Sequence, residues 1–86
     1  MEERNNLAIQ DLYNSCQTIS FLIQNQILEY NLSREEMARR AEIEELELEQ
    51  FLTMRNFELK TAAMYQLLGE ITQEMIREKE VSKGMK

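Results

Sequence analysis

Apolar residues recur at spacings of three and four through the first third of the chain, from Ala8 to Tyr30. Such spacing places the side chains on one stripe of an α-helix. Asn5 or Asn6 can cap the start of this helix by accepting a backbone N–H. We therefore predict one long helix over about residues 6–30, whose apolar side other parts of the chain must cover. The stripe consists of Ala8, Leu12, Cys16, Ile19, Ile23, Ile27 and Tyr30.

The composition of the whole chain favours helices. Proline is absent, only two glycines occur, and 30% of the residues are charged. Each of these properties is typical of helical proteins. A length of 86 residues accommodates one hydrophobic core. We predict a single all-α domain spanning residues 1–86.

A second and a third helix follow the long first one. Ser33 and Glu36 have the spacing of a capping box, in which each side chain binds a backbone N–H of the other residue. The second helix is therefore predicted to begin at Arg34 and to end near Ala41. The third is predicted over about residues 45–54.

Two more helices are predicted in the last third of the chain. Asn56 can cap a fourth helix from Phe57 to Leu68, and Gly69 suits a left-handed C-terminal cap. Thr72 then offers an N-cap for a fifth helix that carries Met75 and Ile76. Residues 77–86 lose the apolar periodicity, so we predict a frayed tail there.

The stretch from Arg34 to Thr53 has the apolar pattern of a helix-turn-helix. In that motif the fourth, eighth, tenth, fifteenth and eighteenth positions are buried, and the fifth is small because the two helices cross there. These positions hold Met37, Ala41, Ile43, Leu48 and Phe51, with Ala38 as the small residue.

The same stretch resembles the Cro and phage-repressor family. Residues 32–38 are similar to the entry into the family's second helix, and residues 67–76 to the entry into its fifth; the resemblance covers about residues 18–76. It implies a lambda-repressor-like helix-turn-helix of about five helices. In that reading, residues 1–17 form an N-terminal extension and residues 18–76 the core.

Two positions depart from the family pattern. The turn position that the family usually fills with glycine is Glu42, so either this side chain tolerates a left-handed backbone or the turn differs in shape. The third helix, which should face the major groove, is acidic: five glutamates and no Lys or Arg lie between residues 42 and 49. Carboxylates repel the phosphate backbone of DNA and release no counterions. The residues expected to face a partner or DNA are Glu44, Glu45, Leu46, Glu49 and Gln50.

Some positions nevertheless suit a nucleic acid. The resemblance places Arg34, Arg55, Asn56 and Lys60 where the family commonly holds backbone phosphates, contacts that position a protein without giving specificity. Gln50 could read an adenine edge. The alternative for the four phosphate-binding candidates is ordinary solvated surface, and for Arg39 and Arg40 it is pairing with Glu35 and Glu36.

Charge and apolar run length exclude other classes. The net charge is −6, which opposes generic attraction to nucleic acid or to an anionic membrane. The longest apolar runs have three or four residues, whereas spanning a bilayer takes about 20. A single cysteine, Cys16, forms no internal disulfide, and no signal-peptide pattern opens the chain. We expect a cytoplasmic protein that does not cross membranes.

Catalytic chemistry is not expected. The chain has no histidine, so it offers no Cys/His metal cluster and no imidazole base to activate Cys16. Glycine-rich phosphate loops are absent, and the glutamate pairs at 35/36 and 44/45 lack a pocket that would raise a carboxyl pKa. We predict a protein that is not an enzyme and uses no cofactor.

Three functions remain open. The first is a repressor-like regulatory protein that acts in gene control mainly through protein contacts; the resemblance implies phage regulators, antirepressors and antitoxins. It would be a homodimer built on helix one, through Ala8, Leu12, Cys16 and Ile19, with the acidic third helix facing a basic protein. The second is a dimeric transcriptional regulator that reads a palindromic operator directly. The third is a structural helical-bundle subunit without helix-turn-helix geometry.

Overall fold

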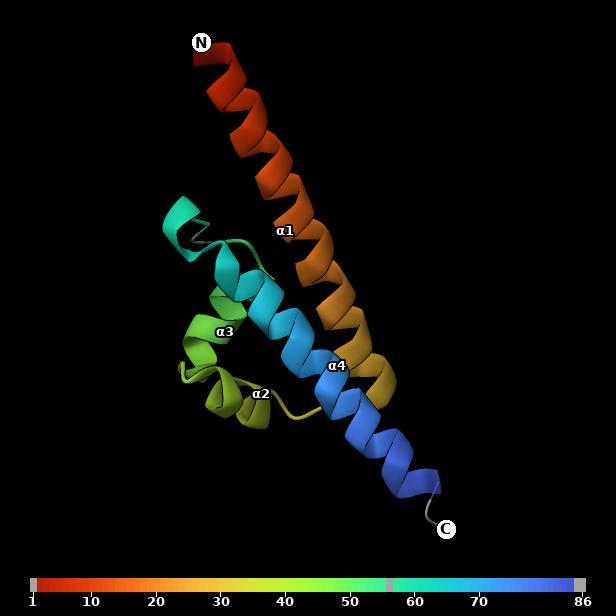
Figure 1. Ribbon diagram of the computed structural model, residues 1–86. Coiled ribbons are helices and arrows are strands. Elements are labelled where there is room, and N and C mark those ends of the chain that lie inside the picture. Colours follow the sequence, from red (N-terminus) through yellow and green to blue (C-terminus); the bar gives the residue numbers. More distant parts are fainter. Residues whose placement is uncertain (1, 56, 85–86) are drawn as a thin grey trace.

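The computed structural model describes residues 2–55 and 57–84 and is all-helical over them (Figure 1). This confirms the predicted all-α class, but over the described residues four α-helices and a short 3-10 turn take the place of the five helices expected. Helix α2 has the predicted bounds, and α3 ends two residues earlier than expected. The elements are α1 (Glu2–Tyr30), α2 (Arg34–Ala41), α3 (Glu45–Leu52), η1 (Leu59–Thr61) and α4 (Ala63–Gly84).

Helix α1 is continuous through residues 14–18, where polar side chains could have interrupted it. Two of these residues bond within the helix instead: Gln10 Nε2 donates to Asn14 Oδ1 at 3.1 Å, and Thr18 Oγ1 donates to the Asn14 carbonyl oxygen at 3.0 Å. The helix begins at Glu2, so Asn5 and Asn6 lie inside it and the predicted N-cap was wrong. The predicted boundary between an N-terminal extension (residues 1–17) and the core therefore does not coincide with a break in α1.

Helix α4 replaces the predicted fourth and fifth helices and runs without a break through Gly69 and Thr72. Gly69 is no left-handed cap; a Cβ built there would stand 3.7 Å from Ile19 Cγ2. The buried Thr72 hydroxyl donates to the Leu68 carbonyl oxygen at 2.7 Å, which is a bond inside a helix and not an N-cap. Contact with α1 thus stabilises a continuous helix where local propensity favours two.

The helix also persists through residues 77–84, where the sequence predicted fraying. Three hydrogen bonds hold this end: Arg40 of α2 donates twice to Glu78, and Lys79 Nζ donates to the Asn31 carbonyl oxygen at 3.1 Å. All three bonds join positions far apart in the sequence, so apolar periodicity carried no sign of them. At its other end α4 begins only at Ala63, because residues 57–62 hold a loop and η1.

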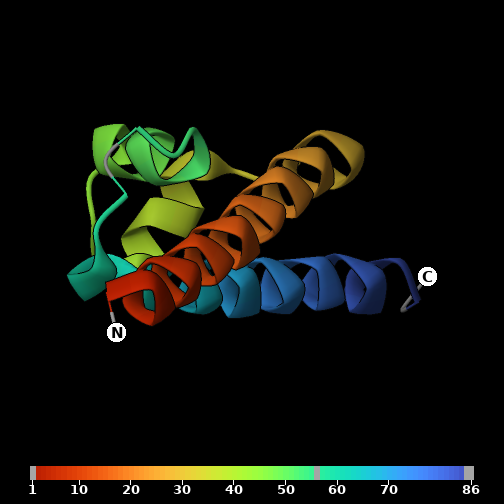
Figure 2. The same ribbon diagram turned by 90° about the horizontal axis from the view of Figure 1, so that it is seen from above.

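Helices α1 and α4 run in the same direction, pack against each other and cross at an angle (Figures 1 and 2). Their relative direction follows from contacts at both ends, since Cys16 Sγ lies 4.0 Å from the Ala62 oxygen and Lys79 binds Asn31. The short helices α2 and α3 lie beside this crossed pair, where α2 contacts α4 and α3 contacts α1 (Figure 2). The first turns of α1 extend past the start of α4 (Figure 1).

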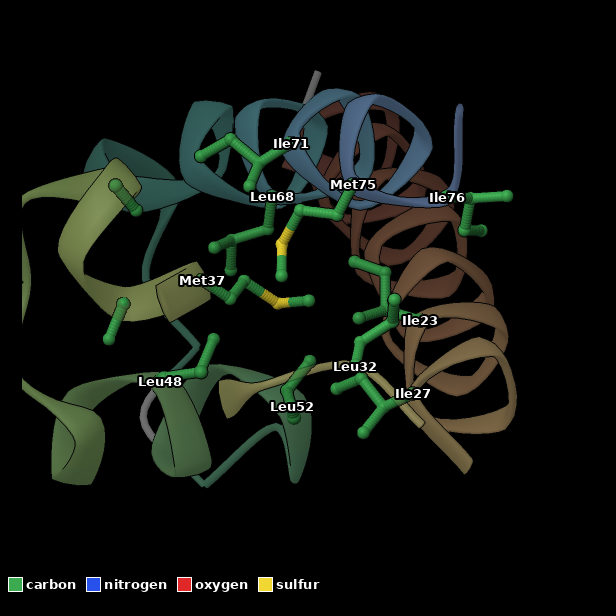
Figure 3. Packing of buried hydrophobic residues seen from close by; sticks show 12 residues of the cluster. Ile23, Ile27, Leu32, Met37, Leu48, Leu52, Leu68, Ile71, Met75 and Ile76 are labelled. Carbon is green, nitrogen blue, oxygen red and sulfur yellow. The ribbon is translucent and has the colours of Figure 1, made fainter. Parts of the chain in front are cut away.

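The hydrophobic core lies where the four helices meet (Figure 3). Met37 of α2 and Leu48 of α3 are fully buried and lie in one cluster with Leu68 of α4. Helix α1 and the segment after it close the core with Ile23, Ile27 and Leu32. Over the described residues, none of the helices combines the length and the apolar character needed to span a membrane.

Candidate interaction surface on the second and third helices

The connection between α2 and α3 is a tight turn built on Glu42. This residue has φ 58° and ψ 42°, which is the left-handed conformation that favours glycine. The turn is closed by backbone bonds, among them the one from Ile43 N–H to the Ala38 oxygen at 3.0 Å. Of the two shapes that the sequence left open, the structure shows the left-handed one. A glutamate therefore accepts the strain that a glycine would avoid.

Helix α2 begins with half of the predicted capping box. Ser33 Oγ accepts the Glu36 N–H at 3.1 Å, as predicted. The Glu36 carboxylate, however, turns away and accepts hydrogen bonds from Arg39 and Arg40. Charge-assisted bonds to two guanidinium groups are stronger than one bond to a backbone N–H, which explains the choice.

The inner side of the α2–α3 pair agrees with the predicted burial. Four of the six positions are buried: Met37, Ala38, Ala41 and Leu48. The other two, Ile43 and Phe51, are partly buried and pack against the same core. The two helices thus pack on the rest of the protein through the predicted residues.

The outer side of α3 is acidic and carries one exposed apolar side chain. Glu44, Glu45 and Glu47 are exposed, and Leu46 between them is 70% exposed. The remaining two predicted partner-facing residues, Glu49 and Gln50, are half-buried. Gln50 lines a hollow of about 150 Å³ beside Phe51 and Glu58. We refer to Glu44, Glu45, Leu46 and Glu47 as the acidic surface.

Arg34, a predicted phosphate ligand, forms an ion pair with Glu49 across the α2–α3 pair. The carboxylate therefore occupies the position next to the guanidinium that a DNA phosphate would need. Both side chains are nearly half exposed, at 44% and 46%. The spacing of 15 residues joins two helices, so it lies beyond the i,i+4 pairs that sequence periodicity detects.

The other predicted phosphate ligands lie after α3. Arg55 and Lys60 are exposed, and Lys60 Nζ stands 3.5 Å from Glu58 Oε2. An exposed pair at this distance contributes little, so both cations face solvent. Asn56, the fourth predicted ligand and the predicted cap of the fourth helix, lies outside the described residues.

A network of charges joins α2 to α4. Arg40 donates from Nε to Glu36 and from its two terminal nitrogens to Glu74 and Glu78, at 2.7 to 3.0 Å. The sequence pattern predicted only local partners for Arg39 and Arg40, of which Glu36 is one. Hydrogen bonds from Arg39 and Arg40 lower the pKa of Glu36 to about 2. The same guanidinium of Arg40 lowers the pKa of Glu78.

The predicted dimer stripe divides between surface and interior. Ala8 is exposed and Leu12 half-buried on the first turns of α1. Cys16 is 3% exposed and sits beneath Ala62, where burial raises the pKa of its thiol. Ile19 packs against the core and against α4. Cys16 is thus buried within its own chain, next to Ala62 directly before α4, and cannot contact a second molecule.

In the described part of the chain, no group of three or more Cys, Asp or Glu side chains is arranged to hold a metal ion. Comparison with known proteins gave no matching family model, no matching curated protein and no matching solved structure.

Proposed function

We propose that this protein is a repressor-like helix-turn-helix regulator that acts in gene control mainly through contacts with another protein. The acidic surface of α3 would be its binding face. The observation that carries the proposal is the ion pair between Arg34 and Glu49. A helix-turn-helix that reads DNA needs a cation free for phosphate beside its recognition helix, and here that helix supplies its own anion.

The partner's chemistry follows from the acidic surface. Three exposed carboxylates surround Leu46, so a complementary face presents Lys or Arg around an apolar pocket. Such charge complementarity accelerates association and selects the partner, while the buried apolar anchor supplies much of the affinity. A basic DNA-binding protein, or a basic segment of one, has this character.

Fluorescence anisotropy of a labelled mixed-sequence DNA duplex tests the proposal. Nearly every DNA reader binds non-specifically at about 50 mM salt and loses most of that binding near 200 mM. We expect no binding by the wild type at either salt concentration. The double variant Glu45→Lys/Glu49→Lys frees Arg34 and reverses the charge of α3, so it should bind at micromolar concentration in low salt.

A matched control separates geometry from net charge. Glu29→Lys/Glu80→Lys changes the charge by the same amount at exposed positions far from α3, and it should not bind. If both double variants bind DNA, the change in net charge alone explains the binding. Binding by neither would argue against a helix-turn-helix arrangement and leave a structural helical-bundle subunit as the better reading.

Partner capture from producing cells completes the test. A basic protein retained by the wild type and by the Glu29→Lys/Glu80→Lys control, but lost by Glu45→Lys/Glu49→Lys, is the expected result. Equal retention by all three proteins would place the contact elsewhere.

Direct reading of DNA is the second candidate. Arg55 and Lys60 are exposed next to α3, and Gln50 stands on the same helix. In that case the wild type itself binds DNA at low salt, and Arg55→Glu/Lys60→Glu abolishes binding. This result would overturn the protein-partner proposal.

A further inference from the structure

A groove of about 490 Å³ runs between α1 and α4, and α2 and α3 contribute no residue to its lining. Its floor is apolar and includes Ile19 and Ile23. Gly69 deepens it, because the glycine has no side chain to cover Ile19. Leu22 stands at the rim and is 51% exposed. The groove is therefore an apolar surface separate from the acidic surface of α3.

The polar rim of the groove is electrically balanced. Glu70 and Arg77 lie on the same side of α4, seven residues apart, which corresponds to about two helical turns or about 10 Å. Among the described residues neither one forms an ion pair. Between them stands Gln73, whose Nε2 donates to Gln26 Oε1 at 3.5 Å and whose amide oxygen can accept a further hydrogen bond. Glu70 and Arg77 thus contribute one negative and one positive charge, neither with an ion-pair partner among the residues that the structure describes.

We propose that this groove binds a second copy of the chain across a twofold axis near Gln73. In an antiparallel arrangement each Glu70 faces the partner subunit's Arg77, and the two Gln73 amides face each other. Leu22 of each copy loses its exposure to water. A twofold contact requires a self-complementary surface, and a residue pair of opposite charge placed symmetrically about an amide has that property.

The net charge of the chain also favours the groove as the contact surface between two copies. Each chain carries −6, so two copies repel each other unless the contact surface is locally neutral. The acidic surface of α3 cannot face its own copy, whereas the groove can. Dimerisation here also leaves α3 exposed on both subunits. The surface differs from the stripe predicted from the sequence, with which it shares only Ile19.

Sedimentation equilibrium over a range of concentrations tests the dimer. The wild type should move from 10.3 kDa to twice that mass as concentration rises. Glu70→Arg and Arg77→Glu each place like charges opposite one another and should weaken dimerisation about tenfold or more. The double swap Glu70→Arg/Arg77→Glu restores opposite charges across the axis and should restore the dimer.

Two exposed positions outside the groove serve as controls. Glu35→Arg and Arg55→Glu repeat the same charge changes and should leave the dissociation constant unchanged. A wild type that stays monomeric at all concentrations overturns the proposal. A dimer that the single reversals do not weaken, or that the double swap does not restore, overturns it equally.

A cross-link locates the axis. Gln73→Cys should form a disulfide-linked dimer under mild oxidation, because the two Gln73 residues stand close to the twofold axis. Gln66→Cys, on the same groove but nearly two turns away from Gln73, should not. Since Cys16 is buried, it does not compete. A linked dimer from Gln66→Cys and none from Gln73→Cys overturns the arrangement.

Discussion

Arg40 of α2 donates two hydrogen bonds to the carboxylate of Glu78 on α4, from Nη1 to Oε2 at 3.0 Å and from Nη2 to Oε1 at 2.7 Å. The same guanidinium donates to Glu36 and Glu74. Isolated surface ion pairs stabilise a protein little, but a two-bond arginine fork within a network contributes more. This network joins α2 to the C-terminal part of α4, and it depends on ionised carboxylates.

Acid should therefore weaken the fold through Glu36. Because its pKa falls from 4.5 to about 2 on folding, the ionised group stabilises the folded protein above pH 4.5, and this stabilisation is lost as the pH falls toward 2. We expect the melting temperature to decrease in that interval. Glu36→Gln should show a smaller decrease.

The measurement is thermal unfolding followed by circular dichroism at several pH values. Glu35→Gln, at the exposed neighbouring position, is the matched control and should follow the wild type. If Glu36→Gln loses as much stability between pH 4.5 and 2 as the wild type does, the bonds from Arg39 and Arg40 do not carry the acid sensitivity.

Gly69→Ala should stabilise the protein. Gly69 lies inside α4, and an added Cβ meets Ile19 Cγ2 at 3.7 Å, an ordinary contact. Alanine in a helix interior is favoured over glycine by about 1 kcal/mol, which corresponds to a rise of about 4–8 °C in the melting temperature of a domain this size. A lower melting temperature would mean that the helix breaks at Gly69, as a C-terminal cap there requires.

Glu42→Gly should also stabilise the protein, for a different reason. With φ 58°, Glu42 bears the steric cost of a left-handed residue, about 1–2 kcal/mol, and glycine does not. Part of the gain is offset by the greater freedom of glycine in the unfolded chain. Denaturant unfolding of the wild type, Glu42→Gly and Glu42→Ala measures this. The alanine variant keeps its Cβ and should gain nothing, so equal gains for both would contradict the assignment of strain.

Two leucines of α3 should respond differently to truncation. Leu48 is fully buried and Leu46 is 70% exposed. Leu48→Ala removes core packing and should cost about 2–5 kcal/mol of unfolding free energy, whereas Leu46→Ala should change it by about 0.5 kcal/mol or less. Urea denaturation compares them. Similar losses for the two variants would contradict the orientation of α3.

Local signals in the sequence located α2 well. Ser33 caps its first turn, and the apolar positions Met37, Ala38 and Ala41 fall on one side. Both depend on residues within about two turns of each other, so periodicity and capping rules suffice to find them. For the same reason the burial of Leu48 on α3 was predictable. On the outer side of α3, however, Glu49 and Gln50, which were expected to face a partner, are half-buried.

Features that depend on distant contacts were not predictable in this way. Gly69 and Thr72 favour a break, yet packing against α1 keeps α4 whole. Arg34 pairs with Glu49 on α3, and Arg40 pairs with Glu78 on α4. Both ion pairs join different helices, and a periodicity pattern describes each helix by itself. The groove between α1 and α4 arises only once those two helices pack against each other.

The pairing of α1 with α4 has a consequence for synthesis. Contacts between residues 16–31 and residues 62–79 join positions 46 to 48 residues apart, so α1 leaves the ribosome well before α4. Contacts with α3 cover part of its apolar stripe, through Ser20 and Gln24, but the rest stays uncovered until α4 has emerged. The complete core therefore forms only after α4 has been translated, and the nascent protein is exposed to chaperones until then.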